Sequence, residues 1–229
     1  MTWRDFWNGA HSIYVNERHS TLHYSGIARD IARLIPHDGA EVLDHGCGEA
    51  LGAGEVAARC ATLYLYDTAP NVQARLRARF VNEPRIIVLS SSALNVLGEA
   101  GLDLIVVNSL LQYLPMQELE ALLDFWRGRL RPAGKLVIAD IILPDVSAAQ
   151  DVKALLTFAW QGGFFFAACR GLVATFFSPY RKLRGEIGLS TYSEEGMLTL
   201  LAGHGFKAER AAANIGHNGA RMTFICVLK

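Results

Sequence analysis

The sequence predicts an α/β fold in which a seven-stranded, mostly parallel sheet carries helices on both faces and ends in an antiparallel hairpin strand. Three observations support this prediction. Short apolar runs alternate with amphipathic segments over residues 41–142, as strands alternate with crossover helices in parallel sheets. A glycine-rich turn follows the first run, and two strand-like runs near the end of the chain flank the short polar segment 214–220.

Each element follows from its local pattern. Apolar residues on one helical face predict a first helix over 22–35, which Pro36 ends. Apolar runs then predict five parallel strands, at 41–44, 62–67, 85–89, 102–108 and 134–142. Amphipathic segments predict the helices between and after them, at 51–60, 71–80, 119–130 and 193–201. The hairpin strands are expected at 206–212 and 221–228.

The composition fits one domain over residues 1–229 and excludes some classes of partner. Lys plus Arg equals Asp plus Glu, at 22 each, so no long-range field favours nucleic acid. The four cysteines, Cys47, Cys60, Cys169 and Cys226, form no CxxC pair, and no basic leader with an apolar signal core begins the sequence. We therefore expect a reducing, cytoplasmic setting without a disulfide framework.

The glycine-rich turn holds the strongest functional signal. It contains Asp44-His45-Gly46-Cys47-Gly48, with an acid two residues before the first glycine. Such a turn brings backbone amides close to a ligand, and a nucleotide is the expected one. The motif resembles the first motif of class I S-adenosylmethionine-dependent methyltransferases, which have a Rossmann-like fold. In that family, the carboxylate attracts the ammonium group of the cofactor, whereas it would repel a pyrophosphate.

Further residues extend the resemblance over about residues 40–140. Asp67 ends the second strand, where the family has an acid that binds the ribose hydroxyls. The stretch NSLLQYLP at 108–115 resembles a family loop that contacts the cofactor ammonium and flanks the methyl group. Ser92 replaces an aspartate that often contacts adenine, and Ala50 replaces a third glycine. The implied cofactor-binding residues are Asp44, Gly46, Cys47, Gly48, Asp67, Thr68, Ser91, Ser92, Ala93, Asn108 and Ser109.

The resemblance implies methyl transfer from S-adenosylmethionine, with S-adenosylhomocysteine as product, to oxygen or nitrogen of a small hydrophobic, aromatic or lipid-like acceptor. Residues 1–36 are expected to form a helical lid over the site. The predicted catalytic residues are His217, Tyr14 and Tyr113, with His217 as a candidate base in the hairpin loop. The predicted acceptor-binding residues are Tyr14, Arg18, His19, Gln112, Tyr113 and Asn218. His19 and His23 share a helical face, but no third ligand is spaced to join them, so no metal is expected.

An aromatic-rich insertion at 144–190 follows the fifth strand, and its segment 154–169 has no formal charge. A membrane-spanning helix needs about twenty consecutive apolar residues. The apolar run in this insertion is interrupted by polar residues, by Gly162-Gly163 and by Arg170. In the family, insertions at this place cap the substrate pocket, and an aromatic cap implies a hydrophobic acceptor. Peripheral membrane contact or homodimer formation through 154–184 would explain the same composition.

Two other functions remain open at this stage. A nicotinamide-dependent oxidoreductase would share the first strand and an acid at Asp67, but its GxGxxG motif would need glycine where Leu51 stands. A catalytically silent nucleotide-binding partner protein would keep the fold and fill the acceptor pocket with side chains.

Overall fold

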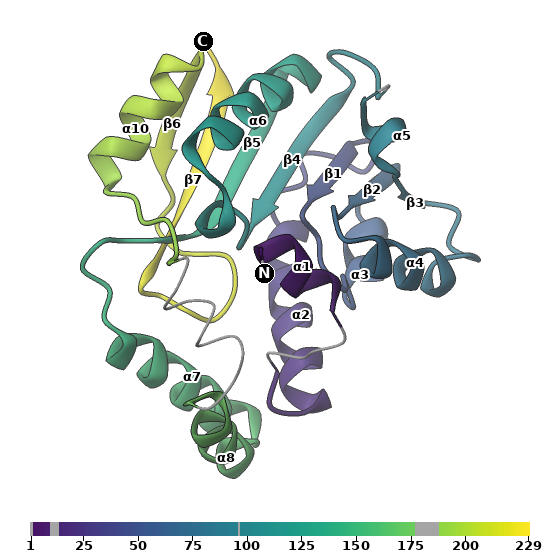
Figure 1. Ribbon diagram of the computed structural model, residues 1–229. Helices are drawn as coiled ribbons and strands as arrows, with labels where there is room; N and C mark the ends of the chain where they lie inside the picture. The colour runs from purple at the N-terminus through teal and green to yellow at the C-terminus, as the bar shows by residue number, and fades with distance from the viewer. Residues whose placement is uncertain (1, 10–13, 96, 177–187) are drawn as a thin grey trace.

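A computed structural model describes residues 2–9, 14–95, 97–176 and 188–229 (Figure 1). The centre is a seven-stranded sheet with the order β3-β2-β1-β4-β5-β7-β6. All neighbouring strands are parallel except that β7 runs antiparallel to both β5 and β6. The strands are β1 (Glu41–His45), β2 (Thr62–Tyr66), β3 (Ile86–Val88), β4 (Leu102–Asn108), β5 (Leu130–Ile142), β6 (Phe206–Arg210) and β7 (Arg221–Leu228). This topology confirms the predicted mostly parallel sheet with an antiparallel strand from a C-terminal hairpin.

Helices cover both faces of the sheet. One face packs against α2 (Glu17–Ala32), α3 (Ala53–Ala57) and α4 (Pro70–Arg79). The other packs against α5 (Ser91–Asn95), η1 (Leu111–Tyr113), α6 (Met116–Arg129) and α10 (Glu194–Gly203). Adjacent strand residues alternate between the two cores: Val42 packs with α2 and α3, and Leu43 packs with α6. This period-two burial follows from the pleat of the strands.

The remaining helices lie at the carboxyl edge of the sheet, where the parallel strands end (Figure 1). The short helix α1 (Trp3–Asn8) lies over this edge, and α7 (Ala148–Gly162) and α8 (Phe165–Phe176) extend beyond it beside α2. Val15 and Leu22 pack against the small core that α7 and α8 form around Ala159, Phe164 and Ala168. The helices α7 and α8 therefore pack on the N-terminal segment, and Asp151 of α7 also pairs with Arg221 of β7.

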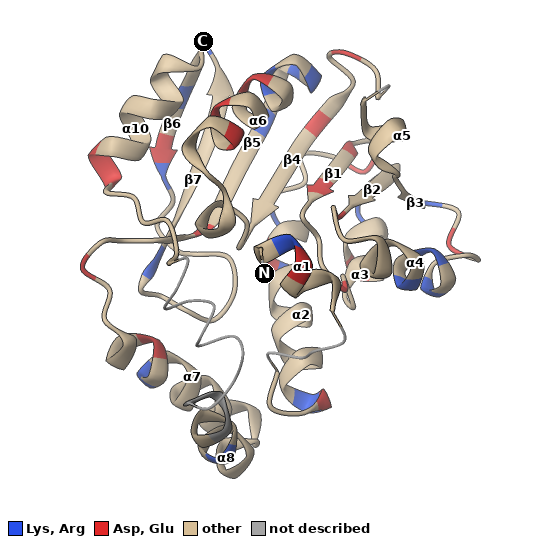
Figure 2. Ribbon diagram, viewed as in Figure 1, with Lys and Arg blue, Asp and Glu red and all other residues tan. Residues whose placement is uncertain are grey.

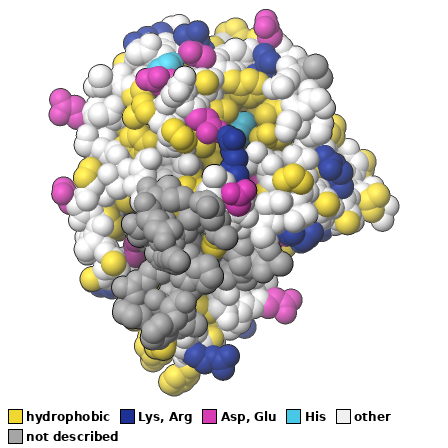
Figure 3. All heavy atoms as spheres, viewed as in Figure 1, with side chains coloured by type: hydrophobic (Ala, Val, Ile, Leu, Met, Phe, Trp, Pro, Cys, Tyr) yellow, Lys and Arg dark blue, Asp and Glu magenta, His cyan; other side chains and the backbone are white. Residues whose placement is uncertain are grey.

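Surface charge is mixed in sign. Lys and Arg are interspersed with Asp and Glu along the elements, and the face shown in Figure 3 mixes both with hydrophobic side chains (Figures 2 and 3). Large apolar side chains are exposed on the insertion, namely Trp160, Phe166 and Val173. Among the described residues, no helix combines the length and apolar character needed to cross a membrane.

Element boundaries differ from the sequence prediction at α2. This helix begins at Glu17 and ends at Ala32, whereas the apolar spacing predicted 22–35. Its start is set by Asn16, whose side chain accepts a hydrogen bond from the His19 backbone N–H at 2.8 Å. A cap of this kind satisfies one of the free amides of the first turn, which apolar periodicity does not reveal.

A close contact between α2 and the residue that precedes α3 gives a test of this packing. A Cβ on Gly52 would lie 2.6 Å from the Ala28 Cβ and 2.9 Å from the Tyr24 carbonyl oxygen. We expect Gly52→Ala to lower the free energy of unfolding by about 1–3 kcal/mol, because neither neighbour can yield without backbone movement. Gly54→Ala, where a Cβ meets nothing within 4 Å, should raise it by up to about 1 kcal/mol. Equal denaturation midpoints for the two variants would contradict this packing.

Candidate functional site

The glycine turn after β1 is held by backbone hydrogen bonds to the neighbouring strand. The N–H groups of Gly46 and Cys47 both donate to the Tyr66 carbonyl, at 2.7 and 3.1 Å. Gly46 and Gly48 adopt positive φ angles of 83° and 57°, which favour glycine because it lacks a Cβ. Ala50 also has a positive φ, 44°, where the resembling family often has glycine. The turn therefore keeps the expected backbone course despite the alanine.

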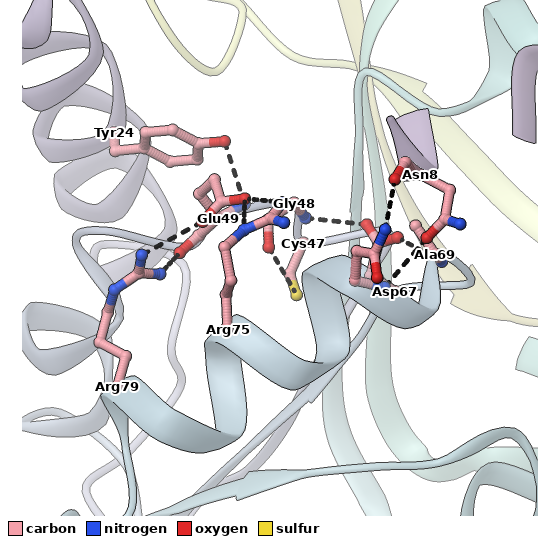
Figure 4. Close-up of polar contacts among 10 residues, drawn as sticks. Asn8, Tyr24, Cys47, Gly48, Glu49, Asp67, Ala69, Arg75 and Arg79 are labelled. Atoms are coloured by element: carbon pink, nitrogen blue, oxygen red, sulfur yellow. Dashed lines mark hydrogen bonds and ion pairs between the residues drawn. The ribbon is translucent and has the colours of Figure 1, made fainter. Parts of the chain in front are cut away.

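Asp67 closes the turn from the end of β2 (Figure 4). One carboxylate oxygen accepts from the Gly48 N–H at 3.1 Å, and the other accepts from the Ala69 N–H at 2.9 Å. Gln73 on α4 donates to the Asp67 carbonyl at 2.7 Å. Each carboxylate oxygen has a further lone pair. Asp67 can thus fix the turn and still accept hydrogen bonds from a ligand in the cavity that it lines.

Glu49 is neutralised by two arginines of α4 (Figure 4). Its carboxylate is 2.5 Å from Arg75 Nη2 and 3.1 Å from Arg79 Nη2. Arg79 also donates to the Glu49 carbonyl at 2.5 Å. From the opposite side, the Tyr24 hydroxyl accepts from the Glu49 N–H at 3.1 Å. These contacts tie α2, the glycine turn and α4 together around one rim of the site.

The carboxylate of Asp44 has no comparable cationic partner. No hydrogen bond or ion pair joins it to any described residue, and it lines the same cavity. Burial, and then the charge of Asp67, raise its pKa to about 7. Burial also raises the pKa of Asp67, although its two backbone hydrogen bonds oppose the shift. Two crowded carboxylates that resist ionisation form a site for a cation.

The cavity above the sheet has a volume of about 1120 Å³. The helix α1 lies across it and bonds to both sides. Asn8 is joined to Asn71 on α4 by two hydrogen bonds of 2.7 and 2.9 Å, and Arg4 pairs with Glu118 on α6. The ring of Trp3 lies 4.8 Å from that of Tyr113. Helix α1, within the 1–36 segment predicted to form a lid, is thus anchored on both sides of the cavity.

The structure places most predicted cofactor residues around one cavity, but one predicted segment lies outside the cavity lining. Asp44, Gly46, Cys47, Gly48, Asp67, Thr68, Asn108 and Ser109 all line the cavity. Ser91, Ser92 and Ala93 do not line it. Ser92 is exposed and its hydroxyl bonds to that of Ser90 at 2.9 Å, and the Ser91 hydroxyl lies 3.3 Å from that of Tyr66. The next two residues, Leu94 and Asn95, line the cavity instead.

Only some of the predicted acceptor-binding and catalytic residues line the cavity. Tyr14, Gln112 and Tyr113 line the cavity. Arg18, His19, His217 and Asn218 do not. Arg18 donates to the Gly162 carbonyl, His19 stacks on Phe164 at 4.9 Å, and Asn218 donates to Asp151 at 3.1 Å. These three side chains join the N-terminal segment and the hairpin loop to α7 and α8.

His217 lies behind another histidine that sequence reasoning gave no role in catalysis. Its ring stacks on Phe158 at 4.2 Å and lies 5.6 Å from His23, which does line the cavity. Burial, helped by the charge of His217, lowers the pKa of His23 to about 3, so His23 is neutral near pH 7. Among the described residues, no group of three His, Cys, Asp or Glu side chains is placed to hold a metal.

Sequence reasoning gave no role to Asp140 or Arg221 and favoured a surface position over substrate contact for His45, yet all three line the cavity. The Nδ1 atom of His45 accepts from Trp126 Nε1 at 3.2 Å, and burial lowers the His45 pKa to about 4. The neutral ring therefore carries its proton on Nε2. Asp140 lies at a strained position in β5, and Arg221 approaches it from β7. Only the place of Asp140 in the last predicted parallel strand could have drawn attention to it.

The residues present fit the cofactor that the motif implies. Asp44 offers a carboxylate to an ammonium group, and Asp67 offers oxygens to hydroxyls. The side-chain oxygens of Asn108 and Gln112 are buried and have no hydrogen bond partner among the described residues. Unpaired buried acceptors are costly, and donors on a bound ligand would satisfy them.

Comparison with known proteins agrees with this geometry. Residues 42–134 match the model of a methyltransferase domain. Uncharacterised methyltransferases of Mycobacterium bovis and Mycobacterium tuberculosis are 26% identical over 127 residues, which cover 56% of this chain and 62% of each relative. The chain therefore matches less than two thirds of the length of these relatives.

Solved structures share the fold. The pyocyanin biosynthetic protein PhzM superposes with a TM-score of 0.60 and 16% identity, over 92% of this chain and 56% of that protein. Magnesium protoporphyrin IX methyltransferase of Synechocystis, with bound S-adenosylhomocysteine, gives a TM-score of 0.57 and 15% identity, over 99% of this chain and 93% of that one. The Rossmann-like sheet is thus the one found in proteins that bind this cofactor.

The raised pKa of Asp44 predicts a stability gain when its charge is removed. The folded-state pKa of about 7 lies above the ordinary value of 3.8, so the free energy of unfolding falls as pH rises from about 4 to about 7. Allowing for solvent screening in the cavity, Asp44→Asn should be more stable than the wild type by roughly 1–3 kcal/mol at pH 8. The gain should shrink towards pH 4. Urea denaturation at both pH values measures it.

Asp103→Asn is the matched control. Asp103 accepts hydrogen bonds from the Glu41 N–H at 2.9 Å and from Arg131 at 2.5 Å, so its replacement should destabilise the protein at pH 8. If Asp44→Asn lost stability as Asp103→Asn does, the Asp44 carboxylate would be stabilised by hydrogen bonds or ion pairs, which would contradict the unfavourable charge inferred here.

Proposed function

We propose that this protein, whose residues 42–134 match a methyltransferase domain, is a class I S-adenosylmethionine-dependent methyltransferase that methylates an oxygen or nitrogen of a small aromatic acceptor. The observation that carries the proposal is the cavity shared by the carboxylates of Asp44 and Asp67 and by the aromatic side chains of α1 and η1. When bound, the cofactor supplies a methyl group on a sulfonium that is already activated for transfer.

The size of the cavity supports two ligands rather than one. Its volume of about 1120 Å³ exceeds the roughly 300–1,000 Å³ of a typical site for one small molecule. The cofactor half lies over the ends of β1 and β2, where Gly46, Gly48 and Asp67 lie. The other half lies over the ends of β4 and β5. Room for an acceptor argues against the silent partner protein, whose pocket would be filled.

The walls of the second half favour an aromatic acceptor. Trp3, Trp7, Tyr14, Tyr113 and Leu189 all line the cavity and contribute apolar and aromatic surface. Flat apolar walls bind planar rings by offset or edge contacts. Equal numbers of basic and acidic residues, 22 each, give no long-range field that would favour a polyanionic substrate or nucleic acid.

The protein itself has three tasks in this reaction. It must align the acceptor atom with the methyl group, exclude water, and remove a proton if the acceptor atom carries one. The lid α1 excludes water, because it bonds to Asn71 on one side and Glu118 on the other. The aromatic walls align the acceptor ring. Neither task needs a metal ion.

The rival oxidoreductase function fits the site less well. A dinucleotide places its pyrophosphate at the glycine turn. Here that turn faces Asp44 and Asp67, whose pKa values are raised by burial first and then by the charge of a neighbouring carboxylate, Asp67 and Glu49 respectively. A pyrophosphate would add to this repulsion, whereas an ammonium group would relieve it.

Calorimetry and a methyl-transfer assay test the proposal together. We expect micromolar binding of S-adenosylhomocysteine, lost in Asp67→Ala, and no binding of NAD. With radiolabelled S-adenosylmethionine, we expect label to enter at least one of 2-naphthol, 2-aminonaphthalene and 2-naphthoic acid, which share one ring system. The control Asp124→Asn changes an exposed carboxylate that pairs with His204, and it should bind and react as the wild type does.

Two results would contradict different parts of the proposal, the cofactor and the acceptor class. Binding of NAD without S-adenosylhomocysteine would reject the cofactor. Binding of S-adenosylhomocysteine with no label in any ring compound would reject the acceptor class and leave the cofactor site standing.

A further inference from the structure

Two non-glycine residues with strained backbone lie together at the ends of neighbouring strands. Ser109, just after β4, and Asp140, in β5, have φ angles of 57° and 59°. Side chains other than glycine seldom adopt this region, and such strain is often kept at functional positions. The Ser109 N–H donates to the Ala139 carbonyl at 3.2 Å, and the Ser109 hydroxyl donates to Asp140 Oδ2 at 2.7 Å. The strained pair therefore fixes one carboxylate in the cavity wall.

The groups around Asp140 come from three further elements. Arg221 of β7 places its Nε 3.8 Å from Asp140 Oδ1 and its Nη2 2.6 Å from Asp151 of α7. The loop residue Asn214 accepts from the Asp140 N–H at 3.0 Å. Burial, as the largest effect, raises the pKa of Asp140, and Asp151 adds to this. Ser109, Arg221 and Asn214 oppose the shift but do not cancel it.

Arg221 gives an independent indication of a ligand at this place. Its side chain is only 9% exposed, and it lines the cavity beside Asp140. Its Nη1 atom is buried and has no hydrogen bond partner among the described residues. An unpaired donor on a buried guanidinium is costly, so a ligand oxygen that accepted from it would be held firmly.

We propose that Asp140 binds the reactive hydroxyl or amine of the acceptor and removes its proton during methyl transfer. The inference rests on the proposed function and adds the residue that completes it. The acceptor's lone pair forms the new bond to the methyl carbon while the carbon–sulfur bond breaks and leaves its electron pair on sulfur. The proton of the acceptor passes to the Asp140 carboxylate, so charge and atoms balance. Ser109 is a positioning residue, because it acts through Asp140.

The neighbouring Arg221 further restricts the class of acceptor that the site would prefer. A ring with two adjacent oxygen atoms could donate to Asp140 from one and accept from Arg221 Nη1 with the other. We therefore expect 2,3-dihydroxynaphthalene to have a lower KM than 2-naphthol. Arg221→Met should remove this preference, because its side chain has no donor.

The pH dependence of kcat distinguishes a proton-accepting role from a structural one. In the wild type, kcat should rise with pH up to the pKa of Asp140 and then level off. Asp140→Asn should lower kcat about 10²–10⁴-fold and abolish this rise. Asparagine is among the side chains that best tolerate positive φ, so the backbone is expected to hold. Ser109→Ala should move the rise to higher pH, because the hydrogen bond that lowers the pKa is lost.

The assay uses the full chain with 2,3-dihydroxynaphthalene and 2-naphthol, and Asp124→Asn serves as an exposed Asp-to-Asn control. S-adenosylhomocysteine should bind Asp140→Asn as tightly as the wild type. An unchanged pH profile in Asp140→Asn or Ser109→Ala would overturn the inference. So would turnover of neither of these compounds, nor of 2-aminonaphthalene, by a wild type that binds S-adenosylhomocysteine. Failure of the wild type to bind S-adenosylhomocysteine would instead reject the proposed function.

Discussion

The burial of the Asp44 carboxylate beside Asp67 is the constraint on which the site depends. Desolvation and like charge make ionisation of Asp44 unfavourable, as its pKa of about 7 shows. Hydrogen bonds from the glycine turn to Tyr66 and Asp67 hold this arrangement in the free protein, with Asp44 in the cavity wall. A cationic ligand would recover the cost on binding. The same arrangement explains why a cavity lined largely by apolar groups can hold a charged cofactor.

The topology separates Asp44 and Asp67 from the place proposed for the acceptor. β1 lies between β2 and β4, so the cofactor carboxylates and the Ser109–Asp140 pair lie at neighbouring strand ends of one rigid sheet. Loops and a short helix complete the cavity above it. Helix α1 contacts Asn71 of α4, Glu118 of α6 and Tyr113 of η1. A rigid sheet with a short helix over its carboxyl edge suits the proposed reaction, which would admit two ligands and then exclude water.

Sequence patterns predicted the sheet because parallel strands buried on both faces are nearly continuous apolar runs. They also predicted the turn at Gly46 and Gly48 and the acid at Asp67, since these depend on local motif chemistry. The start of α2 was missed because the Asn16 cap, not apolar spacing, sets it. Asp140 and Arg221 were missed because their meeting depends on the antiparallel pairing of β5 with β7. Ser92 was assigned by motif position, whereas α5 turns its hydroxyl towards Ser90.

The central claim is that Asp44 has a raised pKa in the free protein and binds the cationic group of the cofactor. Proton release on cofactor binding tests it most directly. Calorimetric titration with S-adenosylhomocysteine at pH 7, in buffers of different ionisation enthalpy, counts the protons exchanged. A pKa of about 7 in the free protein, lowered by the bound ammonium group, predicts release of about half a proton. Asp44→Asn should remove this release. The same dependence of heat on buffer in both proteins would contradict the account.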